Sequence, residues 1–281
     1  MHVAAIGLGL IGGSFAKAAA ASGHEVSVWN RTLSTAEKAL AEGVAKGILD
    51  ETVTSAAGKP DLVFVSLPPD AVVPWIDAHQ EHFKDGTIVV DATGVKRTIC
   101  RDLEKYAFSS RWTFIGGHPM AGKEVTGYVN AEADLFKGAS MILTPYPTCG
   151  RKALELLDSF FKGIGFSQVV VTTPRRHDEM IAYTSQLAHV VSAAYAGDEA
   201  SSCHNGYSAG SFADMTRVAG VDPGVWASLF LANSDFLSAK IDGLISRLSE
   251  FRDALDSSDI EALRGILSRA KTVKERIVSA R

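Results

Sequence analysis

The sequence predicts an α/β region, in which helices cover a doubly wound and mostly parallel sheet, followed by an all-α region. Short β-branched runs alternate with amphipathic helical stretches in the first part of the chain, as in parallel sheets with helices on both faces. Strand signals cease at about Thr173, and helical periodicity continues to the C-terminus. The hydrophobic fraction of 46% and the charged fraction of 21% are those of an ordinary globular protein.

Seven runs are predicted to form strands: His2–Gly7, Glu25–Trp29, Asp61–Ser66, Thr87–Asp91, Thr113–Ile115, Ser140–Leu143 and Gln168–Val171. A helix is predicted over Leu10–Ser22, and another starts at Ser34, where Glu37 would complete a capping box. In the all-α region the periodicity is broken at Asn205–Gly206, Gly220 and Gly243, and Asp222 followed by Pro223 marks a helix start. We place the boundary so that the two domains comprise residues 1–172 and 173–281.

The composition argues against several classes of protein. The net charge is −4 without clustered Lys and Arg, so we expect no nucleic-acid partner. No apolar run is long enough to span a bilayer and no leader is recognisable, so we expect a cytoplasmic protein with no membrane association. Cys100, Cys149 and Cys203 lie far apart without CxxC spacing, which predicts reduced thiols and no metal site.

A glycine-rich motif separates the first predicted strand from the first predicted helix. Gly7, Gly9 and Gly12 form GxGxxG, and a βαβ unit is the context that this motif requires. The glycines permit a tight turn, a close approach of the backbone to a pyrophosphate and close helix–strand packing, while the helix N-terminus offers N–H groups to the phosphates. Residues 1–172 are therefore predicted to be a Rossmann domain that holds a nicotinamide cofactor, and the protein a dehydrogenase. The expected cofactor-binding residues are Gly7, Gly9, Leu10, Ile11, Gly12, Asn30, Arg31, Thr32, Ser66 and Leu67.

The end of the second predicted strand favours NADP over NAD. NAD-binding domains place Asp or Glu there to bind the ribose 2′-hydroxyl, whereas this chain has Asn30, Arg31 and Thr32. These side chains could bind a 2′-phosphate, with Arg31 as the charged partner. The alternative is that Arg31 is a solvated loop residue that stacks on adenine.

Two further segments carry polar groups suited to catalysis or substrate binding. His118 lies in the glycine-rich run Gly116–Glu124, predicted as a loop at the C-terminal edge of the sheet, where open α/β folds bind ligands. It is placed for proton transfer near the nicotinamide, although a turn histidine bonded to its own loop gives the same pattern. Asp178, Ser185 and His189 are spaced to share one helix face, which favours a lined pocket over the alternative of a solvated stripe at a domain interface.

These motifs together resemble the prephenate/arogenate dehydrogenase family of tyrosine biosynthesis, over nearly the whole chain. GLGLIGGS at Gly7–Ser14 is shared with many dehydrogenases, whereas GGHPMAGKEVTGY at Gly116–Tyr128 is more specific. HDEMIAYTSQLAH at His177–His189 is similar to the family's helix that ends in a substrate-contacting histidine. FADMTRVAGVDPGVW at Phe212–Trp226 resembles the segment whose arginine binds a substrate carboxylate.

The resemblance implies roles for individual residues. His118 would be the catalytic histidine, hydrogen-bonded to the ring hydroxyl of the substrate, and Arg217 would pair with a substrate carboxylate. His189 would hold another part of the substrate, and Glu124 matches an acidic residue near the pocket entrance. With Ser185 on the same predicted helix face as His189, the expected substrate-binding residues are Arg217, His189, Ser185 and Glu124.

The chain departs from the family pattern at three positions. Many members carry a serine beside the catalytic histidine where this chain has Gly94, so Thr93 would supply a catalytic hydroxyl from one residue earlier, or the contact is absent. Gln186 stands where some relatives have histidine, and Ala188 where some have proline. The side chain that contacts His118 and the identity of the substrate are therefore left open.

The implied reaction is NAD(P)-dependent oxidative decarboxylation of prephenate to 4-hydroxyphenylpyruvate, or of arogenate to tyrosine. Neutral His118 would accept the hydroxyl proton as hydride leaves for the nicotinamide, and loss of CO₂ would aromatise the ring. One alternative is a 3-hydroxyacid dehydrogenase of the 6-phosphogluconate type, with Lys240 or Lys271 as its lysine. Another is a non-catalytic NADP-binding sensor, which would need neither His118 nor Arg217. Inhibition by tyrosine is not decided by the sequence.

The helical region is expected to form a homodimer. Its helices are too few and too extended to bury their own apolar faces. The apolar residues that suggest this are Val225, Trp226, Leu229, Phe230, Phe236, Leu237, Leu244 and Ile245. Two-fold dimers are the commonest way to bury such surfaces, and the family is usually dimeric through this region. The alternative is a compact monomer.

Overall fold

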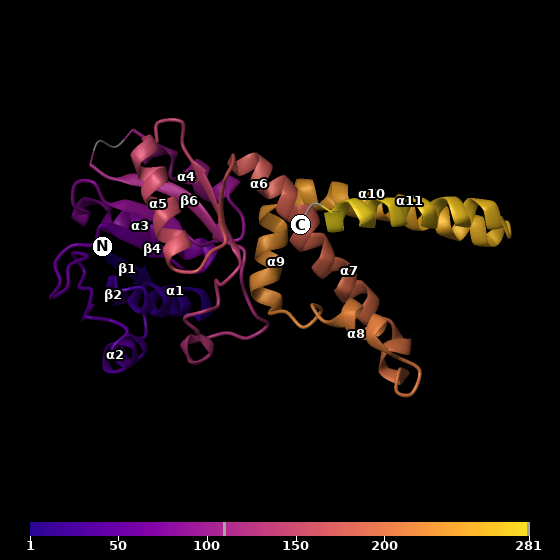
Figure 1. The fold of residues 1–281 in the computed structure, drawn as a ribbon, viewed down its shortest axis with the longest axis horizontal. Helices are drawn as coiled ribbons and strands as arrows, with labels where there is room; N and C mark the ends of the chain where they lie inside the picture. Colours follow the sequence, from indigo (N-terminus) through magenta and orange to yellow (C-terminus); the bar gives the residue numbers. More distant parts are fainter. Residues whose placement is uncertain (109–110, 280–281) are drawn as a thin grey trace.

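The structure is a computed structural model that describes residues 1–108 and 111–279, and it has an α/β half and a helical half (Figure 1). The strands are β1 (His2–Ile6), β2 (Glu25–Trp29), β3 (Gly47–Ile48), β4 (Leu62–Val65), β5 (Ile88–Asp91), β6 (Thr113–Pro119), β7 (Ser140–Pro145) and β8 (Gln168–Val171). They form one sheet in the order β3-β2-β1-β4-β5-β6-β7-β8. The β6–β7 pair is antiparallel and the other pairs are parallel, which confirms the prediction of a mostly parallel sheet.

Helices cover both faces of this sheet. One face packs against α1 (Leu10–Ala21), α2 (Leu33–Ala41) and α5 (Arg151–Gly163), and the other against α3 (Pro69–His79) and α4 (Arg97–Asp102). Successive residues of β1 alternate between the two cores, with Val3 and Ala5 in one and Ala4 and Ile6 in the other, because strand side chains point to opposite faces. All four are buried, so this part of β1 is apolar on both faces.

The helical half projects from one end of the sheet (Figure 1). Its helices are α6 (Pro174–Ile181), α7 (Leu187–Ala196), α8 (Gly210–Thr216), α9 (Pro223–Ala232), α10 (Ser234–Asp256) and α11 (Ile260–Ser279). A π-helical turn, η4 (Ala182–Gln186), joins α6 to α7. Short 3₁₀ turns lie at η1 (Gln80–His82), η2 (Glu104–Tyr106), η3 (Tyr128–Asn130) and η5 (Glu199–Cys203). The side chain of Asp222 accepts a hydrogen bond from the Val225 N–H, which confirms the predicted cap of α9.

Four local expectations differ from the structure. Helix α2 begins at Leu33 after Thr32, and Ser34 lies inside it, so the predicted capping box is wrong. Gly243 lies inside α10, where flanking helix formers outweigh one glycine. The two-residue strand β3 was not predicted, because so short a run carries no periodicity. His118 belongs to β6, which continues beyond Ile115 because Gly116 to Pro119 pair with β7.

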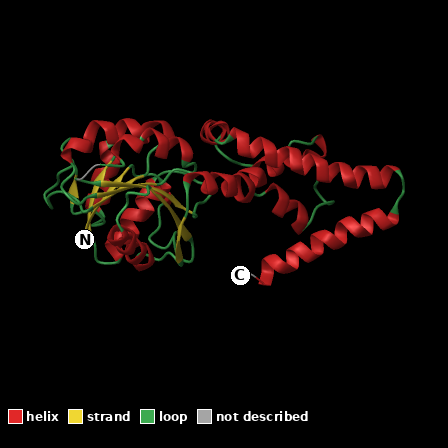
Figure 2. Cartoon of the chain, turned by 90° about the horizontal axis from the view of Figure 1, so that it is seen from above, coloured by secondary structure: helices red, strands yellow, loops and turns green. Residues whose placement is uncertain are grey.

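The long helices α10 and α11 form an arm that extends away from the sheet. Figure 2 shows that α11 turns back after α10 and diverges from it, and α11 has no buried residue. Several large apolar side chains along the arm are more than half exposed: Ile245, Leu248, Leu255, Ile260, Leu267, Val273 and Val278. The described residues include no helix that is long and apolar enough to cross a membrane. The three cysteines are free thiols.

Candidate active site

The glycine motif lies where the strand order changes direction, at the C-terminal ends of the neighbouring strands β1 and β4. Gly7 has a φ of +85°, and a Cβ there would lie 2.4 Å from the Ser66 carbonyl oxygen; a Cβ on Gly12 would lie 1.9 Å from the Gly7 carbonyl oxygen. These two positions therefore require glycine. No atom lies within 4 Å of a Cβ built on Gly9, where α1 begins without a side-chain cap. The space above Gly9 and the free N–H groups of the first turn, which include those of Leu10 and Ile11, fit a pyrophosphate.

Asn30 and Leu67 shape this cradle from both sides. The Asn30 side chain accepts a hydrogen bond from the Leu8 N–H at 2.8 Å and donates to the Thr32 carbonyl at 3.0 Å. Its carboxamide thus fixes the glycine loop to the turn after β2, which leaves Arg31 and Thr32, both exposed, as the free side chains of this turn. Leu67 packs on Gly7 from the end of β4.

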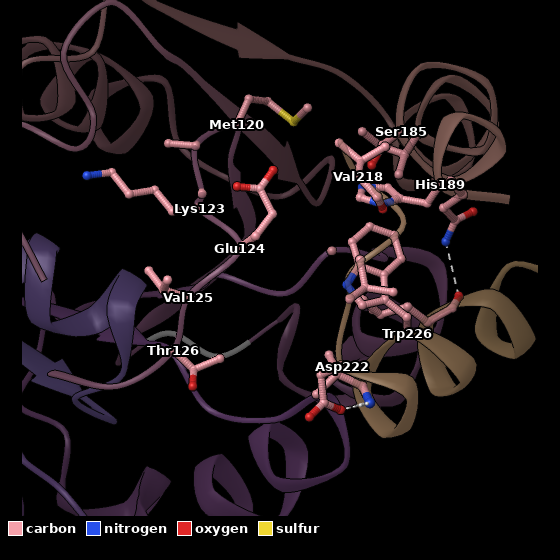
Figure 3. Close-up of a pocket in the computed structure, with 18 of the residues that line it drawn as sticks. Met120, Lys123, Glu124, Val125, Thr126, Ser185, His189, Val218, Asp222 and Trp226 are labelled. Atoms are coloured by element: carbon pink, nitrogen blue, oxygen red, sulfur yellow. Dashed lines mark hydrogen bonds between the residues drawn. The ribbon is translucent and has the colours of Figure 1, made fainter. Parts of the chain in front are cut away.

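A pocket of about 450 Å³ lies between the two halves. Its wall on the sheet side includes His118 and the segment that follows it, and its other wall comes from α6, η4, α7 and α9. Figure 3 shows Met120, Lys123 and Glu124 on one side and Ser185, His189 and Trp226 on the facing side. The lining residues are Gly94, His118, Pro119, Met120, Ala121, Gly122, Lys123, Glu124, Val125, Thr126, Ile181, Ser185, Gln186, His189, Val218, Gly220, Val221, Asp222, Val225, Trp226 and Leu229.

His118 is connected to two buried residues of α6. Its Nδ1 lies 2.9 Å from Nε2 of His177, and Nδ1 of His177 lies 2.7 Å from Oδ1 of Asp178. Asp178 is fully buried and accepts hydrogen bonds from the backbone N–H groups of Lys96 and Arg97 at the start of α4. The line His118–His177–Asp178 therefore crosses from the sheet to the helical half.

Thr93 does not contact this line. Its hydroxyl bonds to Asp91 at 2.5 Å and to the Val95 carbonyl, and the buried Lys96 ammonium bonds to Asp91, to the Thr93 hydroxyl and to the Gly117 carbonyl. Thr93 thus belongs to a buried cluster that fixes the loop after β5 beneath β6. The side-chain partner of His118 is His177, and one feature of the sequence could have indicated it: His177 directly precedes an aspartate in the HDEM run.

Burial determines the ionisation of these residues. Burial, with the charges of His177 and Lys96 adding to it, holds the pKa of the His118 imidazole well below its usual range. The pKa of His177 is also lowered by burial, against the opposing effect of Asp178. Burial alone would raise the pKa of Asp178, but the hydrogen bonds from His177, Lys96 and Arg97 outweigh it and lower the pKa. At neutral pH both rings are neutral and Asp178 is charged.

Of the three residues expected on one helix face, Ser185 and His189 line the pocket and Asp178 does not. The π-helical turn η4 begins after Asp178 and contains Ser185, and it rotates the later residues relative to a regular α-helix. Nδ1 of His189 donates to the Val218 carbonyl at 2.8 Å, so in the neutral ring Nε2 is left as an acceptor. The His189 ring packs against Trp226, with 3.8 Å between ring centroids.

Arg217 lies at the rim of the pocket rather than in its lining. Its guanidinium donates to Glu124 across the mouth at 3.1 Å, and its side chain is 67% exposed. The Glu124–Arg217 ion pair thus links the segment after His118 to the end of α8. Lys123, which precedes Glu124 in the segment after His118, pairs with Glu132 at 2.6 Å. Among residues 1–108 and 111–279, no group of three His, Cys, Asp or Glu side chains is placed to hold a metal ion.

A dinucleotide cradle at the same sheet edge as a pocket lined by a half-buried, neutral histidine is the arrangement of a nicotinamide-dependent dehydrogenase. Two family models match the chain: residues 15–172 match the prephenate dehydrogenase nucleotide-binding domain, and residues 173–269 match the prephenate dehydrogenase dimerization domain. The chain therefore belongs to the prephenate dehydrogenase family, whose members are NAD-dependent dehydrogenases that act by oxidative decarboxylation.

Individual relatives agree with this assignment. The chain is 30% identical to a cyclohexadienyl dehydrogenase from Zymomonas mobilis over 92% of this chain and 89% of that protein. It is 27% identical to a prephenate dehydrogenase from Bacillus subtilis over 96% and 74% of the two chains. Among solved structures, Synechocystis arogenate dehydrogenase superposes with a TM-score of 0.84 at 26% identity, covering 99% of this chain and 100% of that one. Aquifex aeolicus prephenate dehydrogenase, in complex with hydroxyphenyl propionate and NAD+, gives 0.82 at 26% identity and covers 100% and 98%.

Proposed function

We propose that this protein catalyses the oxidative decarboxylation of prephenate or arogenate with NADP as its preferred cofactor. The observation that carries the proposal is the position of His118, with Nδ1 bonded to a buried residue and the pocket on its other side, in a chain of this family. The cofactor accepts a hydride when it is bound. The pocket residues orient the substrate, and Nε2 of His118 takes the proton of its ring hydroxyl.

The remaining pocket residues are suited to a dianionic ring. Arg217 offers a planar fork to a substrate carboxylate, although binding there requires it to leave Glu124. His189 and Ser185 line the same space. The apolar wall formed by Trp226 and Leu229 excludes water from the ring.

The preference for NADP rests on the turn after β2. Arg31 and Thr32 are exposed there and no carboxylate follows the strand, so a 2′-phosphate would meet a cation instead of an anion. The NAD+ complex of the A. aeolicus relative supports use of a nicotinamide dinucleotide of either kind. We also propose that residues 1–172 and 173–281 are the two domains, and that the exposed apolar arm of α10 and α11 pairs with a second copy of the chain, in keeping with the dimerization-domain match.

The test is a matrix of two substrates and two cofactors. Purified protein is mixed with prephenate or arogenate and NADP or NAD, and formation of the reduced nicotinamide is followed by its absorbance. We expect turnover with at least one of the two substrates and a higher kcat/KM with NADP. Cofactor binding without turnover of either substrate would overturn the proposed activity and favour a non-catalytic sensor. Turnover of a 3-hydroxyacid instead would favour the other alternative, in which Lys240 or Lys271 would have to act from α10 or α11.

A further inference from the structure

We propose that His177 and Asp178 are positioning residues that fix the tautomer of His118, so that Nε2, the ring nitrogen left for the pocket, is unprotonated before the reaction. The proposal rests on the proposed function, because it takes His118 as the proton acceptor. It assigns a task to two buried polar residues that do not line the pocket.

Asp178 fixes the direction of the hydrogen-bond line. Its Oδ1 accepts from the Lys96 N–H at 2.8 Å, and its Oδ2 accepts from the Arg97 N–H at 2.9 Å and from Arg97 Nε at 3.2 Å. These donors hold the carboxylate in its ionised form and in a single orientation. An ionised carboxylate only accepts hydrogen bonds, so the contact with His177 requires a proton on Nδ1 of His177.

The direction then passes through both rings. A neutral imidazole carries one proton, so Nε2 of His177, whose Nδ1 is protonated, has none and must accept. Its partner at 2.9 Å is Nδ1 of His118, which therefore donates. Since neutral His118 has its proton on Nδ1, its Nε2 is the basic nitrogen.

Burial, with the charge of Lys96 adding to it, keeps both rings neutral before the reaction. The charged and titratable groups packed around them are Asp91 at the end of β5, Lys96, Arg97 and Cys100 at the start of α4 and Asp178 in α6, with Lys123, Glu124 and His189 around the same pocket. His177 is 2% exposed, so it cannot exchange its partners for water. The buried Lys96 disfavours a second positive charge beside it.

Proton uptake follows the same line. The O–H bond of the substrate breaks as an N–H bond forms at Nε2 of His118, and the resulting imidazolium keeps donating from Nδ1 to His177. Asp178 lies beyond His177 and stabilises the new charge without itself taking a proton. The same arrangement holds a histidine in its working tautomer in Ser-His-Asp triads.

Asp178→Asn should reverse the donor–acceptor direction of the hydrogen bonds from Asp178 to His118, because it replaces one carboxylate oxygen with an amide nitrogen. An amide nitrogen at the Oδ2 position would face two donors of Arg97, whereas at the Oδ1 position it would face one donor, the Lys96 N–H. The amide nitrogen therefore turns towards His177, Nδ1 of His177 becomes the acceptor, and the proton of neutral His118 moves to Nε2. We expect kcat to fall by about two to four orders of magnitude, with KM for substrate and for cofactor changing less than about threefold.

A pair of substitutions at His177 separates polarity from packing. Glutamine can donate from its amide nitrogen to Asp178 and accept at its amide oxygen from His118, so His177→Gln should retain kcat within about tenfold. His177→Phe keeps a ring of similar size without either function, and kcat should fall at least about a hundredfold. His82→Gln, in η1 and remote from the pocket, is the matched control and should leave kcat unchanged. Equal losses in His177→Gln and His177→Phe would show that the residue only fills space.

Ring-nitrogen chemical shifts of ¹⁵N-histidine-labelled protein read the tautomer without any turnover, and the variants assign the signals. In the wild type we expect a protonated Nδ1 and an unprotonated Nε2 for both His118 and His177, and Asp178→Asn should exchange them. A wild-type His118 with its proton on Nε2 would overturn the proposal even if the enzyme is active. The expected shifts in a protein that turns over neither substrate would instead leave the tautomer assignment standing and overturn the proposed function.

Discussion

The ring of His118 lies between two different environments, the buried His177 on its Nδ1 side and the pocket on the other. Burial gives the ring a low proton affinity, which keeps it neutral and able to accept a proton at acidic pH as well as at neutral pH. The short distance to His177 keeps the ring plane fixed at the end of β6. Both properties suit a general base better than a substrate anchor, which would gain from a positive charge.

His118→Asn should therefore remove proton acceptance and leave the cofactor cradle intact. We expect kcat to fall by about two to four orders of magnitude while the cofactor dissociation constant stays within about twofold. Steady-state kinetics and fluorescence titration with reduced cofactor measure the two quantities. Turnover near that of the wild type would remove His118 from the reaction.

The pH profile provides a second measurement on the same residue. A base works in its unprotonated form, so kcat/KM should rise with pH through the pKa of His118 in the free enzyme. Because burial lowers that pKa, the midpoint of the acidic limb should lie below about 6.5, the ordinary value for histidine. A limb centred above this value would contradict the environment that the structure gives the ring.

The Glu124–Arg217 ion pair predicts opposite effects for its two members. Arg217→Ala should raise KM for the substrate roughly 10- to 150-fold, the value of a charge-assisted hydrogen bond of about 1.5–3 kcal/mol. Glu124→Gln frees Arg217 and removes a negative charge from the mouth, so KM should fall, by no more than about fivefold for so exposed a pair. Initial-rate measurements at saturating cofactor decide both. A rise of KM in Glu124→Gln would show that Glu124 itself holds the substrate.

At the scale of single elements, the turn after β2 carries the cofactor preference. Arg31→Ala should lower the ratio of kcat/KM for NADP to that for NAD by roughly 10- to 150-fold, through loss of a phosphate contact of about 1.5–3 kcal/mol. Lys38→Ala removes a cation from the adjacent helix α2 and serves as the control, with a change below about twofold. A wild-type enzyme with a higher kcat/KM for NAD would contradict this interpretation of the turn.

Helix α4 is one of the elements that join the two halves. Arg97, at its start, bonds to Asp178 of α6, to Asn233 and to both carboxylate oxygens of Asp235 in α10, and stacks on Phe236. Arg97→Ala should lower the free energy of unfolding by about 1.5–3 kcal/mol, because it leaves the buried Asp178 without one of its donors. Arg176→Ala removes an exposed pair with Glu179 and should cost less than about 1 kcal/mol. Denaturant titration of both variants measures the difference, and equal values would argue against a joining role.

The sequence predicted the elements better than their ends and their contacts. The alternation of apolar runs with helical stretches predicted the sheet and the change to helices near Thr173, because buried strands are recognisable as short apolar runs. It could not show that β6 includes His118, since this extension depends on pairing with β7, a segment more than twenty residues later. Likewise Asp178 was expected in the pocket because a regular helix was assumed, and the π-helical turn has no simple sequence signal.

In the candidate active site, the local sequence motif was predicted and the contacts between distant residues were not. The glycines at positions 7, 9 and 12 could be assigned from the sequence because their spacing defines a motif with a known backbone geometry. The role of Thr93 was expected from a neighbouring family position, whereas its hydroxyl is held by Asp91 and Lys96. His177 was missed because its importance comes from its contact with His118, about sixty positions earlier, and from Asp178, which is itself held by the backbone of Lys96 about eighty positions earlier.

At the scale of the whole molecule, the exposed arm predicts a dimer. Part of the apolar surface first assigned to an interface, Val225, Trp226 and Leu229, lines the pocket instead, and Leu237 is buried. Further exposed apolar residues lie along α10 and α11. Nothing in residues 1–108 and 111–279 covers this surface, which resembles that of obligate partners.

Light scattering at micromolar concentration should therefore give a mass about twice the 29.9 kDa of one chain. Leu267→Asp, in the middle of α11, should shift the protein towards a single chain because it places a charge in an apolar interface. Leu156→Asp, at an exposed site on α5, is the control and should leave the mass unchanged. A wild-type mass near that of one chain would rule the dimer out.

The line from His118 to Asp178 has a consequence for recombining relatives. The base and the anchoring N–H groups come from the α/β half, whereas His177 and Asp178 come from the helical half. A chimera that joins the first half of one relative to the second half of another would inherit the base and its orienting partners from different parents. Each half could fold and bind its own ligand while the hybrid remained a poor catalyst. The two halves therefore cannot diverge independently at the residues that form the hydrogen bonds between His118, His177 and Asp178.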